Sequence, residues 1–165
     1  MLERLSMKEL DRLDIQILDL LQKNSNLSTK EIGHKVHLST TPVYERIKRM
    51  EREGYIKNYV AVLDAEKLDR SLTVFCNVTL KEHSKVIGHQ FVNDILSLDE
   101  ITECYNISGD YDFLLKVMVK DMKAYQDFVL NKLGEIANIG SAHSTFVMGK
   151  IKESIHVPLK GLGKK

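Results

Sequence analysis

Hydroxyl and basic side chains are concentrated between residues 39 and 52, and proteins contact double-stranded DNA through such groups. Hydroxyl groups can hydrogen-bond to base edges in the major groove, and cationic groups pair with phosphates. In a helix with about 100° between residues, Val43, Ile47 and Met50 share one apolar face, which leaves an arc of polar side chains. The candidate DNA contacts are Ser39, Thr40, Thr41, Tyr44, Arg46, Lys48, Arg49 and Arg52.

The alternative interpretation is that this arc is an ordinary solvated helix face. The residues that precede this helix favour the DNA-binding interpretation. Ser28 and Glu31 have the spacing of a capping box, in which hydroxyl and carboxylate satisfy free N–H groups at a helix start. Ser39 can cap the basic helix, and His37-Leu38 leaves room only for a tight turn between the two helices. The pattern predicts a helix-turn-helix whose second helix enters the major groove.

A further helix is expected before this pair. Residues 11–23 place Ile17 and Leu21 on one apolar face, and Asp11 or Asp14 could cap the first turn. The three helices together predict a small winged-helix-like domain with its own apolar core.

The composition changes after the basic helix. Gly54 stands where a glycine ends a helix, and residues 55–63 are rich in strand formers. We expect a strand there that links two domains. The predicted boundary gives a DNA-binding domain over residues 1–63 and a second domain over residues 64–165.

The second half alternates between strand and helix periodicity. The expected order is strand, helix, strand, strand, helix, strand, over residues 72–80, 84–98, 101–107, 113–119, 121–133 and 139–151. This order predicts a ferredoxin-like βαββαβ unit, in which an antiparallel sheet carries both helices on one face. The fold class is therefore α+β. The tail over residues 158–165 is expected to be disordered.

The composition limits the classes of function. The chain has 165 residues, a formal net charge of +1 and 43% hydrophobic residues. DNA affinity must therefore come from a local patch rather than from bulk positive charge. Cys76 and Cys104 lack CxxC spacing, which indicates reduced thiols. No signal peptide and no apolar run of about 20 residues is present, so we expect a cytoplasmic protein without a membrane partner.

Catalytic and metal-binding sequence patterns are absent. The sequence has no GxGxxG, no phosphate-binding glycine loop and no HExxH. His34 and His37 are interpreted as surface residues. Asp110, Asp112 and His143 could form a metal or acid–base site only if the fold brought them together, and a turn is the simpler interpretation. We expect no enzyme activity, no metal and no cofactor.

The order of these features resembles the Lrp/AsnC family, the feast/famine regulators, and looks closest to the leucine-responsive regulatory branch. The resemblance covers nearly the whole chain. It is carried jointly by Leu10–Asp14, Ile17-Leu18, Leu38–Val43, Arg46–Arg49, Gly54–Ile56, Gly109–Asp112 and Ser144–Phe146. It implies a sequence-specific DNA-binding transcriptional regulator, built from homodimers that often assemble into octamers.

The resemblance also implies an amino-acid effector, with leucine as a candidate, bound at the second domain between dimers. The effector residues would be Gly109, Asp110, Tyr111, Asp112, Ser144 and Thr145. Gly109 permits close approach of the backbone to an α-carboxylate. Either Asp110 or Asp112 could pair with an α-amino group, and Tyr111 could line the pocket for the effector side chain. The alternative is that Gly-Asp is simply hairpin turn chemistry.

The chain departs from the family at His37, where the turn usually carries glycine. If that position needs φ > 0, histidine tolerates it at a cost of at most about 1–2 kcal/mol.

A function of another class remains open. The chain could be an amino-acid-binding βαββαβ sensor or an enzyme dimer whose helical half mediates protein contacts. The basic arc favours the regulator, and the missing catalytic pattern weakens the enzyme alternative.

Overall fold

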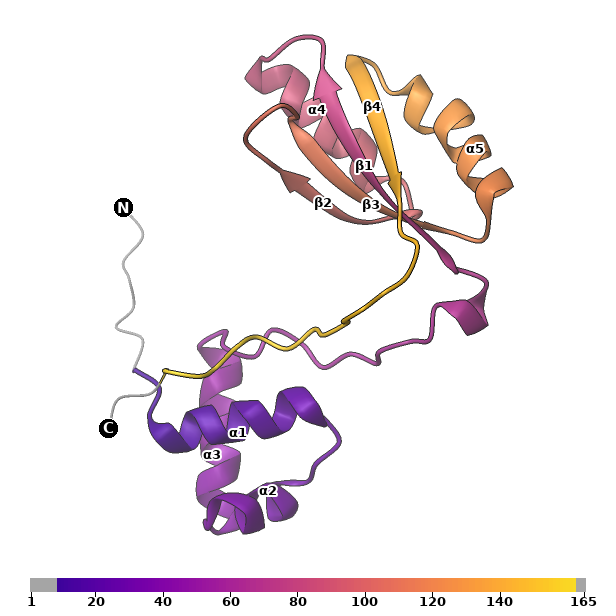
Figure 1. Ribbon diagram of the computed structural model, residues 1–165. Helices are drawn as coiled ribbons and strands as arrows, with labels where there is room; N and C mark the ends of the chain where they lie inside the picture. The colour runs from indigo at the N-terminus through magenta and orange to yellow at the C-terminus, as the bar shows by residue number, and fades with distance from the viewer. Residues whose placement is uncertain (1–8, 163–165) are drawn as a thin grey trace. The chain divides into compact units, whose positions relative to one another are not determined.

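The computed structural model describes residues 9–162, which form two compact units (Figure 1). One unit contains residues 9–62 together with 153–162, and the other contains residues 63–152. The break after residue 62 lies close to the expected boundary. The assignment of residues 153–162 to the helical unit differs from the expectation that they belong to the second domain.

The helical unit is a three-helix helix-turn-helix, as the sequence predicted. It consists of α1 (Arg12–Lys23), α2 (Thr29–Val36) and α3 (Thr40–Arg52). Apolar side chains from all three helices form one core, and its buried members are Ile17, Leu21, Ile32, Val36, Val43, Ile47 and Met50.

The starts of α1 and α2 are each closed by a capping box. At α2, the Ser28 hydroxyl accepts from the Glu31 N–H at 3.2 Å, and the Glu31 carboxylate accepts from the Ser28 N–H at 2.8 Å. At α1, Asp11 and Asp14 exchange the same two bonds, at 2.9 and 3.0 Å. Each box satisfies donors that the first helical turn leaves free, and this explains why these short helices begin where they do.

The segment expected as a linking strand forms no strand. Residues 57–64 have no regular secondary structure and pair with no strand of the described chain. Val60 and Val62 remain 63% and 71% exposed. A strand needs a neighbour that supplies hydrogen bonds, so β-branched composition alone was not sufficient here. A short 3-10 turn, η1 (Glu66–Leu68), leads into the second unit.

The second unit has the predicted βαββαβ order. Its elements are β1 (Leu72–Leu80), α4 (Lys85–Leu96), β2 (Ile101–Asn106), β3 (Phe113–Val119), α5 (Met122–Asn131), η2 (Leu133–Glu135) and β4 (Ile139–Phe146). The strands lie in the order β2-β3-β1-β4, and each neighbouring pair is antiparallel. The last strand ends at Phe146, five residues before the expected end at Ile151.

The core of this unit lies between the sheet and its two helices (Figure 1). Alternate residues of the two central strands are buried, as at Val74 and Leu115, and they pack with Phe91 of α4 and Phe128 of α5. Because residues of one parity share one sheet face, both helices cover the same face, as predicted.

The C-terminal segment has a defined path along the helical unit. The Val157 backbone N–H donates to the Gln22 side chain at 3.1 Å, and the Gln22 amide donates to the Val157 carbonyl at 3.3 Å. Leu159 and Leu162 line a cavity of about 1320 Å³ together with residues of α1 and the linker. The two bonds are made by Val157, just before the tail over residues 158–165, so the expected disorder of that tail stays a prediction, and residues 163–165 lie outside the described chain.

Candidate nucleic-acid interface and effector site

The solvent-facing side of α3 carries most of the expected DNA contacts. Thr40, Thr41, Tyr44, Lys48 and Arg52 are exposed, and they follow one another at helical spacing. Ser39 is the N-cap residue, but its hydroxyl makes no capping hydrogen bond. The expectation that Ser39 caps the helix is correct for its position at the N-cap and wrong for its side chain. The hydroxyl at the start of α3 is therefore available to a ligand.

The turn before α3 brings it close to α2. His37 adopts the left-handed conformation, with φ 56° and ψ 43°, so the position expected to need φ > 0 does need it. A side chain at Gly33 would place its Cβ 2.6 Å from the Leu38 carbonyl oxygen. Gly33, within α2, therefore allows the chain to pass close to the helix as it turns toward α3.

Lys48 is a charged group near the middle of the exposed face. Its Nζ donates to Glu51 at 2.6 Å, and it also lies 5.8 Å from the centre of the Tyr44 ring. The bond to Glu51 raises the pKa of Lys48 above its ordinary value. The side chain is 51% exposed, so exchanging this surface partner for a phosphate costs little.

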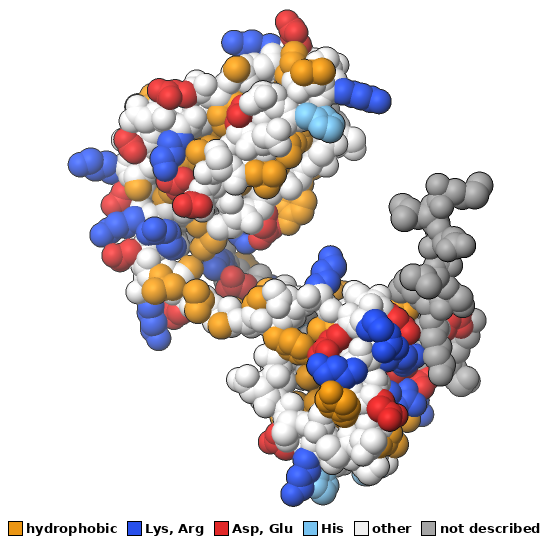
Figure 2. Space-filling model, turned by 180° about the vertical axis from the view of Figure 1, so that it is seen from behind, with side chains coloured by type: hydrophobic (Ala, Val, Ile, Leu, Met, Phe, Trp, Pro, Cys, Tyr) orange, Lys and Arg blue, Asp and Glu red, His pale blue; other side chains and the backbone are white. Residues whose placement is uncertain are grey.

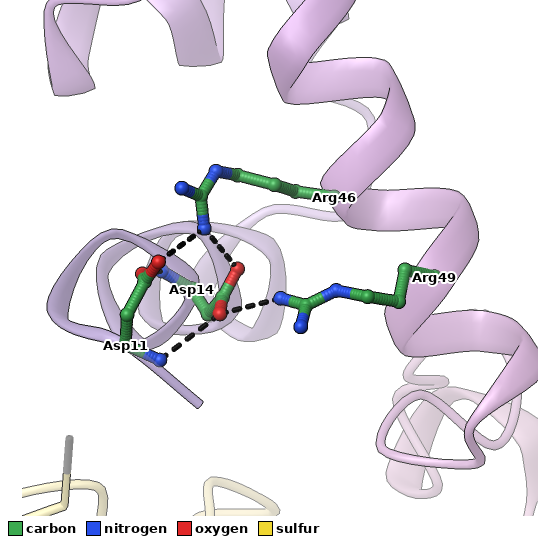
Figure 3. A network of polar contacts seen from close by, with 4 residues as sticks. All are labelled: Asp11, Asp14, Arg46 and Arg49. Atoms are coloured by element: carbon green, nitrogen blue, oxygen red, sulfur yellow. Dashed lines mark hydrogen bonds and ion pairs between the residues drawn. The ribbon is translucent and has the colours of Figure 1, made fainter. Parts of the chain in front are cut away.

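Arg46 and Arg49 lie differently from the expectation. Figure 3 shows both guanidinium groups turned toward α1, where they meet the Asp14 carboxylate. The Arg49 side chain is 14% exposed, so its expected place on the open arc is wrong. Arg46 also pairs with Asp11 at 2.7 Å. These two arginines connect helices, and the open cations of the arc are Lys48 and Arg52.

The ion-pair role of Asp14 was missed by reasoning from the sequence. The signal was present, because Asp14, Ile17 and Leu21 recur at i, i+3 and i+7 and so share the buried face of α1. A carboxylate on an apolar face requires a cationic partner from another element. The spacing of Arg46 and Arg49, one turn apart on α3, could have indicated that partner.

Acidic and basic side chains lie interspersed on both units on the face shown in Figure 2. This agrees with the net charge of +1. Positive potential for DNA must therefore come from a few local cations, as the composition indicated.

The turn at residues 109–112 connects β2 to β3. The Ile107 N–H donates to the Asp112 carbonyl at 2.9 Å, and Gly109 has φ 123°. Gly109 and Asp110 are exposed at its tip. Tyr111 is partly buried, and its ring centre lies 5.5 Å from that of His143 on β4.

Asp112 has both carboxylate oxygens engaged. Oδ2 accepts from the Leu80 N–H at 2.7 Å, and Oδ1 lies 2.9 Å from Nε2 of His83. The side chain thus connects the turn to the end of β1. Of the two aspartates considered for an α-amino group, Asp110 has the freer carboxylate. His143 contacts Tyr111 rather than either aspartate.

Ser144 and Thr145 are not brought together with this turn within one chain. Register places Phe113 opposite Val78 and Val78 opposite Ala142. The two residues therefore lie about 7–10 Å farther along β4 than the level at which the turn ends. They also face opposite sides of the sheet. The Ser144 hydroxyl points to the helix side, where it lies 2.6 Å from the Tyr125 hydroxyl.

Among the residues that the structure describes, no three His, Cys, Asp or Glu side chains are grouped so that they could hold a metal ion. No helix of the described chain is long and apolar enough to cross a membrane.

The two units together define a class of protein. A helix-turn-helix joined to a βαββαβ unit defines a two-domain protein of the helix-turn-helix DNA-binding class. Residues 10–57 match the winged helix-turn-helix DNA-binding family, and residues 73–157 match the Lrp/AsnC ligand binding domain. The chain belongs to the Lrp/AsnC family of transcriptional regulators.

Relatives support this assignment over more than nine-tenths of the chain. The leucine-responsive regulatory proteins of Escherichia coli K12 and Klebsiella pneumoniae are each 39% identical over 153 residues, which is 93% of this chain and of each relative. An AsnC family transcriptional regulator from Agrobacterium tumefaciens is 39% identical with a TM-score of 0.87, and the match covers 91% of this chain and 97% of that one.

A transcriptional regulator from Neisseria meningitidis, solved in complex with L-methionine, has a TM-score of 0.88 at 32% identity. The match covers 92% of this chain and 97% of that one. The expected family and fold class are confirmed.

Proposed function

We propose that this regulator binds specific DNA sequences through the exposed face of α3 and that an amino acid bound to its second unit changes that binding. The exposed hydroxyl and basic groups of one helix, held by a capped helix-turn-helix, are the main support. Ser39, Thr40, Thr41 and Tyr44 would meet base edges, and Lys48 and Arg52 would meet phosphates.

The proposed effector is an amino acid with an apolar side chain. Leucine is indicated by the names of the 39% identical relatives, and methionine by the complex of the Neisseria regulator. The turn at Gly109–Asp112 supplies an exposed backbone that could receive an α-carboxylate and the open carboxylate of Asp110 for an α-amino group. Ser144 and Thr145 would join this site only from another copy of the chain.

The proposed assembly is a homodimer that can form octamers in the cytoplasm. The linker at residues 57–64 supports a dimer, because its strand-forming side chains are exposed and its backbone has no partner strand among the described residues. A dimer would present two α3 helices about 34 Å apart, the spacing of successive major-groove faces of one DNA turn. An effector that favours one assembly would change DNA affinity by no more than its preference for that assembly.

Fluorescence anisotropy tests the function. The full-length protein is titrated onto a duplex from upstream of its own gene and onto a scrambled duplex, without effector and with leucine, methionine or aspartate. We expect at least about tenfold tighter binding to the native duplex, in line with specific recognition. Leucine or methionine should shift this affinity and aspartate should not. Equal, salt-sensitive binding to both duplexes would favour the ligand-binding alternative without DNA recognition.

The role of Asp110 is tested by Asp110→Asn. The amide keeps the shape of the side chain but removes its charge, so the effector concentration for half-maximal response should rise about tenfold or more, as for a lost charge-assisted bond. DNA binding without effector should stay unchanged. Ser108→Ala, at an exposed position of the same loop, is the control. An unchanged response would assign the turn a purely structural role.

A further inference from the structure

We infer that Asp14 is a positioning residue of the DNA interface, which holds Arg46 and Arg49 so that they orient α3 rather than contact phosphates. This inference rests on the proposed entry of α3 into DNA. It reassigns two of the four cations that the sequence pattern gives to the interface, and it adds a residue of α1 that contacts no DNA itself.

The Asp14 carboxylate is divided between the two arginines (Figure 3). Oδ1 accepts from Nη1 of Arg46 at 2.7 Å, and Oδ2 accepts from Nη2 of Arg49 at 2.5 Å. The Asp14 side chain is 1% exposed. Two attachments one helical turn apart on α3 resist both rotation of α3 about its axis and sliding along α1. A single ion pair would allow either motion.

The backbone of α1 also holds the carboxylate in place. Asp14 occupies the third position of the helix, and Oδ2 accepts from the Asp11 N–H at 3.0 Å in the capping box. Asp11 in turn adds a second oxygen to Arg46 at 2.7 Å. The cap that starts α1 is therefore also the anchor of α3, so the start of one helix sets the orientation of the other.

The charges of this cluster compensate one another. Two carboxylates and two guanidinium groups sum to a formal charge of zero, so the cluster adds little to the potential that a phosphate meets. Nη1 of Arg49 is buried without a hydrogen-bond partner in the described structure. To reach a phosphate, Arg49 would have to leave this site and deprive the buried Asp14 carboxylate of a partner, which is costly for a desolvated charge.

The expected effect on DNA binding differs from that of a lost phosphate contact. Each phosphate contact contributes about one unit to the slope of log K against log salt concentration, and it contributes on any DNA sequence. A positioning residue instead aligns the hydroxyl groups at the start of α3 with base edges. Its loss should lower the ratio of affinities for native and scrambled duplexes while the salt slope is kept.

The test measures both quantities for the full-length protein and four variants. Lys48→Gln and Arg52→Gln should each lower the salt slope by about one and change the ratio little. Arg49→Gln should keep the slope and lower the ratio about tenfold. Asp14→Asn should lower the ratio at least as much, with a slope that is unchanged or steeper because it releases two arginines.

A double variant shows whether the two side chains act through one contact. If they do, the double variant Asp14→Asn with Arg49→Gln should have a ratio of native to scrambled affinity no lower than that of the worse single variant. If the two side chains contribute independently, the reductions of this ratio in the two single variants would multiply. Arg49→Lys is the conservative variant. Only one nitrogen of Arg49 bonds Asp14, so a lysine can keep the pair and should hold the ratio within about threefold of wild type. This comparison remains decisive if Asp14→Asn does not fold by circular dichroism.

The outcomes separate this inference from the function on which it rests. A wild-type chain that does not distinguish the two duplexes would overturn both. A wild-type chain that does distinguish them, with a slope lowered by about one in Arg49→Gln and a normal ratio, would overturn the role of Asp14 alone. A ratio in Arg49→Lys as low as that in Arg49→Gln would do the same.

Discussion

Two single residues, one in α2 and one in the turn that follows it, meet different steric demands. His37 accepts a left-handed conformation, and Gly33 accepts the close approach of the Leu38 carbonyl. The first demand is a strain of about 1 kcal/mol for a residue with a side chain, and the second admits no side chain without a shift of the backbone. The two demands are independent, so Gly33 removes the steric contact while the strain at His37 remains.

His37→Gly should stabilise the helical unit by about 0.5–1 kcal/mol, because glycine adopts φ > 0 without strain. Urea denaturation followed by circular dichroism measures the change. Gly54→Ala is the opposite control, since Gly54 also has a positive φ, 78°, and open space around it. We expect a loss of about 1 kcal/mol there. A less stable His37→Gly protein would mean that the imidazole makes a compensating contact.

At the level of elements, the capping boxes make the helix starts sensitive to acid. Hydrogen bonds from the Ser28 hydroxyl and N–H lower the pKa of Glu31. Burial would raise the pKa of Asp11, but bonds from the Asp14 N–H and from Arg46 outweigh it and lower the pKa overall. A carboxylate whose pKa is lower in the folded chain adds stability above its unfolded pKa, and this stability is lost as pH falls through the folded pKa.

We therefore expect the free energy of unfolding to be constant near neutral pH and to fall below about pH 5, where carboxylates of unfolded chains begin to protonate. Glu31→Gln should reduce the dependence on pH, because the amide does not titrate in this range. Denaturation of both proteins at several pH values between about 3 and 7 checks this. Parallel curves for the two proteins would show that the box at α2 does not carry the effect.

At the level of the whole molecule, the linker between the units bears on the proposed homodimer. Residues 57–64 combine exposed valine and leucine side chains with a backbone that no described strand pairs. Strand formers in this state favour association with another copy, and this would place two helical units on one DNA site. Because each helical unit carries only a modest local charge, binding of two units to one DNA site would be important for the affinity for DNA.

Val60→Lys with Val62→Lys should weaken the homodimer, because two charges would enter an apolar strand contact. Size-exclusion chromatography with light scattering should show about half the mass of the wild-type dimer, and DNA affinity should fall by about 10²-fold or more. Val86→Lys is the control, since Val86 is 79% exposed on α4. A wild-type mass in the linker variant would exclude the linker from the dimer contact.

The sequence by itself determined the features that depend on near neighbours. Helices were predicted from the capping residues and from the periodicity of Val43, Ile47 and Met50. Strands were predicted from alternation such as that along residues 72–80, and the order of helices and strands along the chain predicted the α+β class. These signals are local, because helix caps and periodic faces are set within a few residues. The end of the last strand and the linking segment depended on partners elsewhere in the chain, and there the predictions were less accurate.

Only the tertiary structure decided which chemical groups are free. Arg49 and Lys48 are neighbours with similar charge, yet one is held by Asp14, 35 residues earlier, and the other faces solvent. Asp112 is committed to Leu80, and Ser144 to Tyr125, whereas Asp110 remains open. Ion pairs and hydrogen bonds between distant segments exist only when the chain has packed, so spacing along the sequence can propose functional groups but cannot show which of them a ligand will meet.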